Sequence, residues 1–128
     1  MTNVLAVLAG KKILVVDDEV ALRESIREDL QSLEAEVFEA ANGRIAYDMV
    51  GKIQPDVIIS DLRMPGGDGI ELLQRVRASR MQPEPLAFLI TGFADLTLEQ
   101  AKAVGAQGVL VKPFNLAQLR DLVAGSFS

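Results

Sequence analysis

Four short apolar runs of this chain each end in side chains that can do chemistry. Asp17 and Asp18 follow the first run, Asp61 the second, Thr91 the third and Lys112 the fourth. Three carboxylates repel one another unless a cation lies between them, and Mg²⁺ suits a site of carboxylate, water and phosphate oxygens. A hydroxyl and an ammonium beside such an ion could hold a phosphoryl group. These residue types predict a magnesium-dependent phosphoryl site, provided that the fold brings them together.

The apolar runs have the length and composition of buried parallel strands, and a helix-like segment follows each of them. They occupy residues 13–16, 57–60, 86–90 and 108–111. In an open α/β sheet, ligands bind at the carboxyl ends of the strands, near the point where the strand order reverses. We therefore expect the three carboxylates, the hydroxyl and the ammonium to meet at one edge of a sheet.

Strand and helix signals alternate five times, which predicts a doubly wound α/β fold. The predicted strands cover residues 13–16, 36–40, 57–60, 86–90 and 109–111. The predicted helices cover about residues 20–33, 43–53, 70–79, 96–104 and 116–124. Helical spacing predicts that Ile45, Met49, Val50 and Ile53 face inward. The helix at 96–104 has the weakest apolar stripe of the five.

The turn after the first strand indicates the strand order. A dinucleotide-binding sheet would carry G-x-G-x-x-G there, whereas this chain has Asp17-Asp18-Glu19, whose charges would repel a pyrophosphate. Right-handed crossovers and short loops leave few other topologies. We therefore expect a flavodoxin-like, five-stranded parallel sheet in the order 2-1-3-4-5, with five helices.

The composition excludes several classes of function. A chain of 128 residues suits one domain, and its hydrophobic fraction of 49% can supply a core. The absence of cysteine excludes disulfides and thiol chemistry and fits a cytoplasmic location. The absence of histidine excludes a phosphohistidine, so another molecule would have to bring any phosphoryl group. A net charge of -5 argues against direct binding of nucleic acid.

The start of the chain is apolar, but it lacks the basic n-region of a signal peptide. It is also shorter than the roughly 20 residues that a membrane-spanning helix needs, so we expect no membrane association. We expect residues 1–11 to be an N-terminal extension packed on the domain. The domain itself would cover residues 12–125, followed by a C-terminal tail at 126–128.

Four motifs, each at the end of a predicted strand, resemble those of the receiver domain of bacterial two-component response regulators, of the chemotaxis-regulator kind. They are Asp17-Asp18, the run Asp-Leu-Arg-Met-Pro-Gly-Gly-Asp-Gly at 61–69, Thr91-Gly92 and Lys112-Pro113-Phe114. Each motif alone is a weak signal, but the ordered set is specific and covers about residues 12–123. The resemblance implies a phospho-accepting switch that receives its phosphoryl group from a histidine kinase or a phosphotransfer protein.

The resemblance also implies a role for each matching acidic residue. Asp61 would be the phospho-acceptor. Asp18 would ligate Mg²⁺ directly, and Asp17 would act through a water molecule. Asp61 and the backbone carbonyl of Arg63 would complete the protein's share of the metal shell.

The remaining implied roles concern the phosphoryl group and the partner. The Thr91 hydroxyl and the Gly92 N–H would bind phosphoryl oxygens, and Lys112 would pair first with Asp61 and then with the phosphoryl group. The domain would catalyse only its own phosphorylation and dephosphorylation. A downstream protein or output domain would bind the face formed by the segments at 96–104, 109–111 and 116–124.

The chain departs from the family pattern at two places. Many receivers carry an aromatic residue three positions before the lysine, where this chain has Val109. A valine has no ring to rotate, so the loop after Thr91, which includes Phe93, is the alternative element for the response. The stretch at 105–108 also lacks the acidic residues typical of the DNA-binding dimer class of receivers.

Several of these residues also have a purely structural interpretation. Asp17 and Asp18 could cap the helix that follows them, and Asp68 before Gly69 is more typical of a turn or a helix cap than of a ligand. The bond between Lys112 and Pro113 is expected to be cis, because the lysine must turn back toward Asp61 and only X–Pro adopts cis readily.

Two other functions remain open at this point. A hydrolase of the haloacid-dehalogenase type also uses an aspartate nucleophile, threonine and lysine around Mg²⁺. It needs a second acid two residues after the nucleophile, where this chain has Arg63, and a cap domain for which 128 residues leave no room. A phosphorylation-independent interaction module is the second alternative, although such a module need not keep the full acidic set.

Overall fold

A computed structural model of the protein describes residues 4–92 and 96–127, and within these ranges five strands alternate with five α-helices after a short 3-10 helix. The strands are β1 (Lys12–Val16), β2 (Glu36–Ala40), β3 (Val57–Asp61), β4 (Leu86–Thr91) and β5 (Gly108–Val111). The helices are η1 (Val4–Leu8), α1 (Val20–Gln31), α2 (Gly43–Ile53), α3 (Gly69–Ala78), α4 (Leu98–Ala103) and α5 (Leu116–Gly125). The predicted alternation is confirmed.

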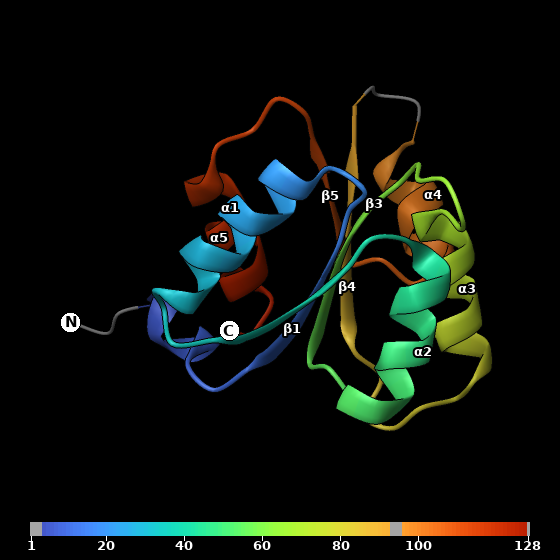
Figure 1. Ribbon diagram of the computed structural model, residues 1–128, viewed down its shortest axis with the longest axis horizontal. Helices are drawn as coiled ribbons and strands as arrows, with labels where there is room; N and C mark the ends of the chain where they lie inside the picture. Colours follow the sequence, from blue (N-terminus) through green and yellow to red (C-terminus); the bar gives the residue numbers. More distant parts are fainter. Residues whose placement is uncertain (1–3, 93–95, 128) are drawn as a thin grey trace.

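The five strands form one parallel sheet in the order β2-β1-β3-β4-β5, which confirms the predicted topology. Helices α1 and α5 cover one face of the sheet, and α2, α3 and α4 cover the other (Figure 1). Because both faces are covered, β1, β3 and β4 are apolar along most of their length, whereas the edge strand β2 carries Glu36 and Glu39. The strand order reverses between β1 and β3, where ligand sites of such sheets are found.

The core is divided between the two faces of the sheet, as the alternation along β1 shows. Ile13 and Val15 pack with α1 and α5, whereas Leu14 and Val16 pack with α2 and α3. All four side chains are buried. The ends of this strand are therefore held from both sides, which fixes the position of the residues that follow it.

The inward orientation predicted for Ile45 is wrong. Ile45 is 42% exposed, whereas its neighbour Ala46 is buried. The side chain of Asn42 accepts a hydrogen bond from the Ile45 N–H and starts the helix at Gly43, with Ala46 and Val50, four residues apart, toward the sheet. This orientation turns Ile45 outward despite its size.

The fourth helix is shorter than predicted. Thr97 and Gln100 form a capping box, so α4 begins at Leu98 rather than at residue 96. Gly105, with φ of 99°, follows its end. Only Ala101 of this helix is buried.

The predicted cis bond between Lys112 and Pro113 is present, and the bond between Gln82 and Pro83 is also cis. At the N-terminal end, η1 contacts α5, and Leu8 is fully buried in the same core cluster as Ala124.

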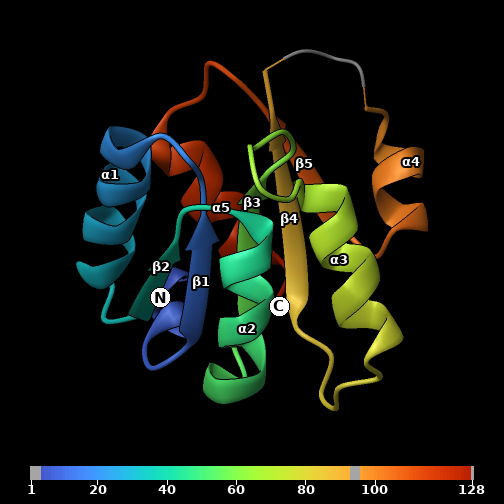
Figure 2. The same cartoon turned by 45° about the vertical axis from the view of Figure 1, so that its right-hand side comes forward.

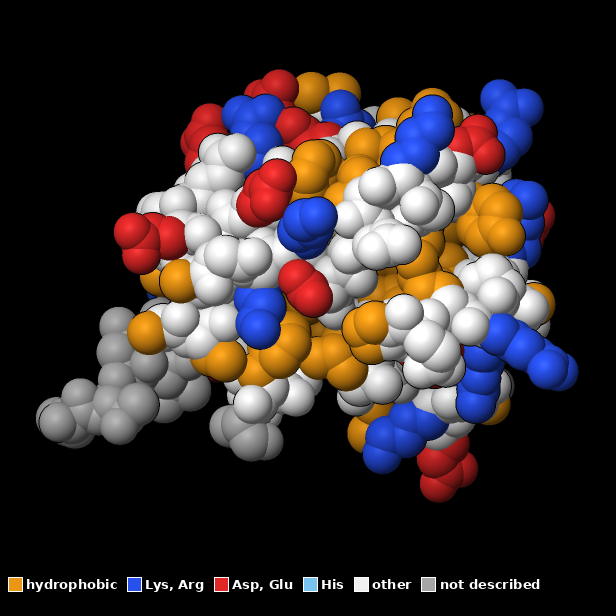
Figure 3. All heavy atoms as spheres, turned by 90° about the horizontal axis from the view of Figure 1, so that it is seen from below, with side chains coloured by type: hydrophobic (Ala, Val, Ile, Leu, Met, Phe, Trp, Pro, Cys, Tyr) orange, Lys and Arg blue, Asp and Glu red, His pale blue; other side chains and the backbone are white. Residues whose placement is uncertain are grey.

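Figure 3 views the molecule from the end of the sheet opposite the carboxyl ends of the strands. Hydrophobic side chains reach the surface near the middle of this face, with charged side chains on both sides of them.

Candidate functional site

The carboxyl ends of the strands bring together the acidic residues that the sequence analysis selected. Asp17 and Asp18 follow β1, and Asp61 is the last residue of β3. One carboxylate oxygen from each of the three lies within 4.8 Å of the others. The Nζ atom of Lys112, directly after β5, lies 3.5 Å from Asp61 Oδ2 and 4.0 Å from Asp17 Oδ2. The three carboxylates and the ammonium thus form a single cluster.

Asp17 is the most deeply buried member, with 1% of the residue exposed. Its Oδ1 accepts a hydrogen bond from the Glu19 N–H at 2.8 Å, while its buried Oδ2 has no hydrogen-bond partner among the described residues. Burial, followed by the charges of Asp61 and Asp18, raises the pKa of Asp17 to about 6, although the Glu19 N–H and Lys112 act in the opposite direction. Asp17 therefore orders the turn between β1 and α1 with one oxygen and leaves the other for a cation.

Asp61 is held through both of its carboxylate oxygens. Oδ1 accepts a hydrogen bond from the Leu62 N–H at 3.0 Å, and Oδ2 faces Lys112. Burial raises the pKa of Asp61, and the charge of Lys112 lowers it. The hydroxyl of the fully buried Ser60 donates to the Asp61 carbonyl at 2.9 Å, a contact that sequence reasoning missed because Ser60 ends an apolar run.

The three carboxylates fit a divalent cation. A buried, unpartnered oxygen on Asp17, next to Asp18 and Asp61, destabilises the fold unless a positive charge lies nearby. The Lys112 ammonium alone is 3.5 Å or more from the nearest carboxylate oxygen. An all-oxygen donor set with few protein ligands is typical of Mg²⁺. The helix-cap interpretation of Asp17 and Asp18 is wrong, because the N-cap of α1 is Glu19 and no side chain caps it; Asp17 Oδ1 binds the Glu19 N–H, which precedes the helix.

Thr91 and Lys112 are joined through the sheet. The Lys112 N–H donates to the Thr91 carbonyl at 2.8 Å, and Thr91 is buried at the end of β4. Gly92 is exposed, and a Cβ at this position would meet no atom of the described residues within 4 Å. The Arg63 side chain is exposed in the loop after β3, and the use of its carbonyl as a ligand remains a prediction. Phe93 lies outside the described residues.

The loop after β3 is tied to the strand that carries Asp61. Gly69 donates its N–H to the Leu62 carbonyl at 2.9 Å, and a Cβ on Gly69 would lie 2.5 Å from the Asp61 carbonyl oxygen. A larger residue therefore cannot take this position without moving the strand end. Asp68 caps α3 by accepting the Glu71 N–H at 2.7 Å, as its turn-like context predicted.

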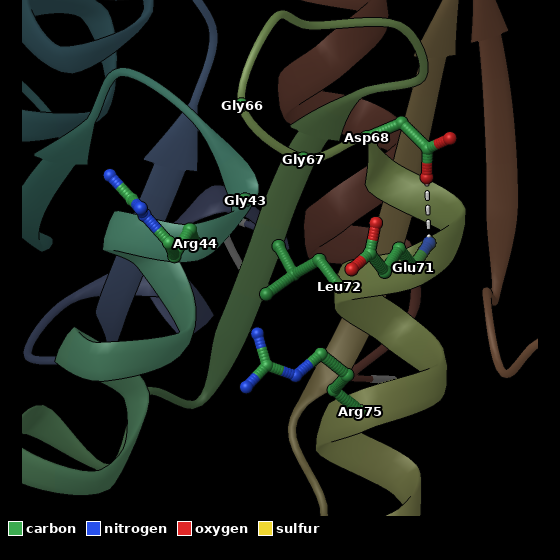
Figure 4. A pocket seen from close by; sticks show the side chains of 8 residues that line it. All are labelled: Gly43, Arg44, Gly66, Gly67, Asp68, Glu71, Leu72 and Arg75. Atoms are coloured by element: carbon green, nitrogen blue, oxygen red, sulfur yellow. Dashed lines mark hydrogen bonds between the residues drawn. The ribbon is translucent and has the colours of Figure 1, made fainter.

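A separate hollow of about 180 Å³ lies between the start of α2 and α3 (Figure 4). Its lining combines Arg44 and Arg75 with Asp68 and Glu71, so it does not share the acidic character of the carboxylate cluster. The Arg75 guanidinium also lies 4.0 Å from the centre of the Tyr47 ring, which ties α3 to α2.

Comparison with known proteins agrees with this geometry. The family model of the response regulator receiver domain matches residues 13–124. The chain belongs to the response regulator receiver domain family. It is therefore a receiver domain of the two-component type, and the hydrolase and interaction-module alternatives are not favoured.

Curated relatives of this receiver domain differ in length. Sporulation initiation phosphotransferase F of Bacillus subtilis is 33% identical over 117 residues, which is 91% of this chain and 93% of the relative. The phosphate regulon transcriptional regulatory protein PhoB of Pseudomonas aeruginosa is 35% identical over 118 residues, 91% of this chain but 50% of the relative. The chain thus spans nearly all of one relative and half of the other.

Solved structures share the fold. Chemotaxis protein CheY4 of Vibrio cholerae has a TM-score of 0.81 and 37% identity, covering 90% of this chain and 97% of that one. A receiver domain from Bermanella marisrubri has a TM-score of 0.84 and 30% identity, covering 93% of this chain and 99% of that one.

Within the described residues, no helix has both the length and the apolar content that crossing a bilayer requires.

Proposed function

We propose that the domain accepts a phosphoryl group on the Asp61 carboxylate in a Mg²⁺-dependent reaction, from a histidine kinase or a phosphotransfer protein. The observation that carries this proposal is the convergence of three carboxylates within 4.8 Å, with the Lys112 ammonium 3.5 Å from Asp61 Oδ2. The proposed ligands of Mg²⁺ are Asp18, Asp61, the Arg63 carbonyl and, through water, Asp17. The ion would neutralise charge on the phosphoryl oxygens and help to orient them.

The chain's own residues supply the rest of the reaction. A carboxylate oxygen of Asp61 attacks phosphorus and forms an acyl phosphate, while the bond from phosphorus to the donor nitrogen breaks and its electron pair stays on the donor. Lys112 pairs with the Asp61 carboxylate before the reaction. When that carboxylate loses its charge on bonding to phosphorus, the Lys112 ammonium pairs with the phosphoryl group. Thr91 donates its hydroxyl and Gly92 its N–H to phosphoryl oxygens, which carry more charge than the carboxylate did.

The readout is proposed to be a protein partner or an output domain that binds the face of α4, β5 and α5. Leu98 of α4 and Val111 of β5 support this, since they are 49% and 45% exposed although both are apolar. The proposal includes a cytoplasmic location, no direct nucleic-acid contact and catalysis limited to the domain's own phosphorylation and dephosphorylation. Residues 12–125 are the proposed domain, between an extension at 1–11 and a tail at 126–128.

Acetyl phosphate with Mg²⁺, followed by mass mapping of the modified residue, tests this function. We expect one added phosphoryl group on Asp61, no labelling after chelation of Mg²⁺, and none in Asp61→Asn. Asp68→Asn is the matched control, because it removes an exposed acid from the neighbouring loop and should be labelled like the wild type. Continued labelling of Asp61→Asn would remove Asp61 from the acceptor role.

A further inference from the structure

Arg23 of α1 connects the acidic turn to strand β2. Its Nη1 donates to the carbonyl oxygen of Asp17 at 2.6 Å, and its Nε donates to Glu39 Oε1 at 3.0 Å. The Arg23 side chain is 15% exposed. Helix α1 lies beside β2, so this link spans a short distance at the end of the sheet (Figure 2).

The peptide groups on both sides of Asp17 are thus tied to the end of β2. The Asp17 N–H donates to the carbonyl of Ala40 at 3.1 Å, and Ala40 directly follows Glu39, the partner of Arg23. The Asp17 carbonyl is held by Arg23. Main-chain motion at this turn would therefore break a hydrogen bond on one side or the other.

The turn needs such a constraint because the Asp17 side chain favours outward movement. Asp17 carries a buried oxygen without a hydrogen bond and lies in a cluster with two other carboxylates. Outward movement of the turn would hydrate that oxygen and reduce the repulsion from Asp61. A metal site loses affinity when its ligands can move away before the ion arrives, because part of the binding free energy is then used to order them.

We propose that Arg23 is a positioning residue, which holds the backbone of Asp17 so that Asp17 and Asp18 face Asp61 at the spacing that a divalent cation requires. This inference rests on the proposed function of the carboxylate cluster. Glu39 orients the guanidinium by accepting its Nε–H. Arginine makes these contacts from two nitrogen atoms of one rigid plane, whereas lysine has a single nitrogen at the end of a flexible chain, so lysine is not an equivalent residue.

Arg27 provides a matched comparison within the same helix. Its Nη1 donates to Glu39 Oε2 at 2.6 Å, so it shares the acidic partner of Arg23. Among the described residues, Arg27 forms ion pairs with Glu39 and Glu28 and none with the acidic turn. Replacing Arg27 should therefore weaken an ion pair of Glu39 while leaving the contact between Arg23 and Asp17 in place.

Charge and positioning make opposite predictions for Arg23. The guanidinium is a cation beside the acidic cluster, so if its charge alone mattered, its removal would strengthen the binding of Mg²⁺. If its hydrogen bond to the Asp17 carbonyl matters, its removal weakens that binding. The sign of the change in affinity therefore decides between the two.

The test measures Mg²⁺ affinity by titration calorimetry in Arg23→Met, Arg23→Lys and Arg27→Met. We expect a loss of about 10- to 100-fold in Arg23→Met, the usual effect of removing a residue that orients metal ligands. Arg23→Lys should also bind more weakly than the wild type, although it keeps the charge. Arg27→Met should stay within about twofold, because Arg27 does not contact the acidic turn and a partly exposed ion pair contributes little. Unchanged or tighter binding in Arg23→Met would overturn the inference.

Amide exchange without Mg²⁺ separates this inference from the proposed function. The Glu19 N–H, which donates to Asp17 Oδ1, should exchange faster in Arg23→Met and Arg23→Lys but not in Arg27→Met. A wild-type protein that binds no Mg²⁺ would contradict the proposed function, while the exchange comparison would still decide whether Arg23 holds the turn. Unchanged exchange at Glu19, or an equal increase throughout β3, would refute the positioning role. Should Arg23→Met not unfold cooperatively, Arg23→Lys provides the same comparison.

Discussion

Replacing Asp17 by asparagine should stabilise the metal-free protein at neutral pH. The substitution keeps an oxygen that can accept the Glu19 N–H and removes the charge from the buried Oδ2 atom. The new amide N–H₂ can donate toward the Asp61 carboxylate, which belongs to the same cluster. A repulsive contact is thus exchanged for an attractive one without a change in volume.

The size of this effect follows from the pKa of Asp17. Its folded-state pKa is raised from 3.8 to about 6, so the folded protein takes up a proton more readily than the unfolded chain between these values. Stability from this group is fully present below pH 3.8 and is lost as the pH rises through about 6. A shift of this size corresponds to about 3 kcal/mol, and solvent near the exposed Asp18 reduces it, so we expect about 1–3 kcal/mol at pH 7.

Thermal unfolding in the presence of a chelator measures this difference. At pH 7 we expect Asp17→Asn to melt roughly 4–12 °C above the wild type, and the gap should close toward pH 4 as wild-type Asp17 becomes protonated. Asp68→Asn removes the same charge from an exposed helix cap and should change the melting temperature little at either pH. A melting temperature for Asp17→Asn at or below that of the wild type at pH 7 would show that the buried carboxylate is already satisfied.

Three further substitutions address other parts of the site. Asp18→Ala should abolish the rise in melting temperature that Mg²⁺ produces in the wild type, and an unchanged rise in a Mg²⁺ titration would place the ion elsewhere. Gly69→Ala should lower the free energy of unfolding by about 1–3 kcal/mol in urea, because its Cβ would meet the Asp61 carbonyl. Gly92→Ala keeps the N–H, and its methyl group would meet none of the described atoms within 4 Å, so acetyl phosphate should label it at a rate close to that of the wild type. A large loss of labelling there would mean that the glycine itself is required.

The sequence predicted the strands and the meeting of acidic side chains because both depend on simple patterns. A buried parallel strand must be apolar throughout, and parallel strands necessarily end at the same edge. The orientation of α2 was harder to predict, since it depends on where Asn42 caps the helix rather than on which residue is larger. Ile45 therefore faces outward while the small Ala46 packs on the sheet.

The supporting contacts of the site could not be predicted in this way. Arg23 and Glu39 are charged residues on a helix and a strand, and in sequence they resemble ordinary solvated positions. Their function depends on a distance across two elements, which no local pattern contains. Gly69 is similar, because its need for a missing side chain arises only when the loop after β3 folds back onto Asp61.

The helices differ in how strongly they are anchored. Ile26 and Leu30 of α1 and Val123 of α5 are fully buried, and Leu119 of α5 is nearly so. In contrast, α4 buries only Ala101. Since each buried methylene contributes about 0.8 kcal/mol, α4 can be displaced at a much lower cost than α1 or α5.

This difference in anchoring indicates that α4 is the helix that moves in the proposed switch. A phosphoryl group on Asp61 adds oxygens that the Thr91 hydroxyl can approach, and Thr91 ends the strand whose chain continues toward α4. Val109 packs with Ala101 and Ala106 beneath that helix, so it can respond to a shift of α4 by a change in packing, without a ring to rotate. In the proposed switch, the acidic turn, held by α1 and β2, would stay fixed while the weakly anchored helix moves, since switching elements are drawn from such low-stability segments. The valine is therefore compatible with signalling through α4, although it excludes the aromatic rotation found in many receivers.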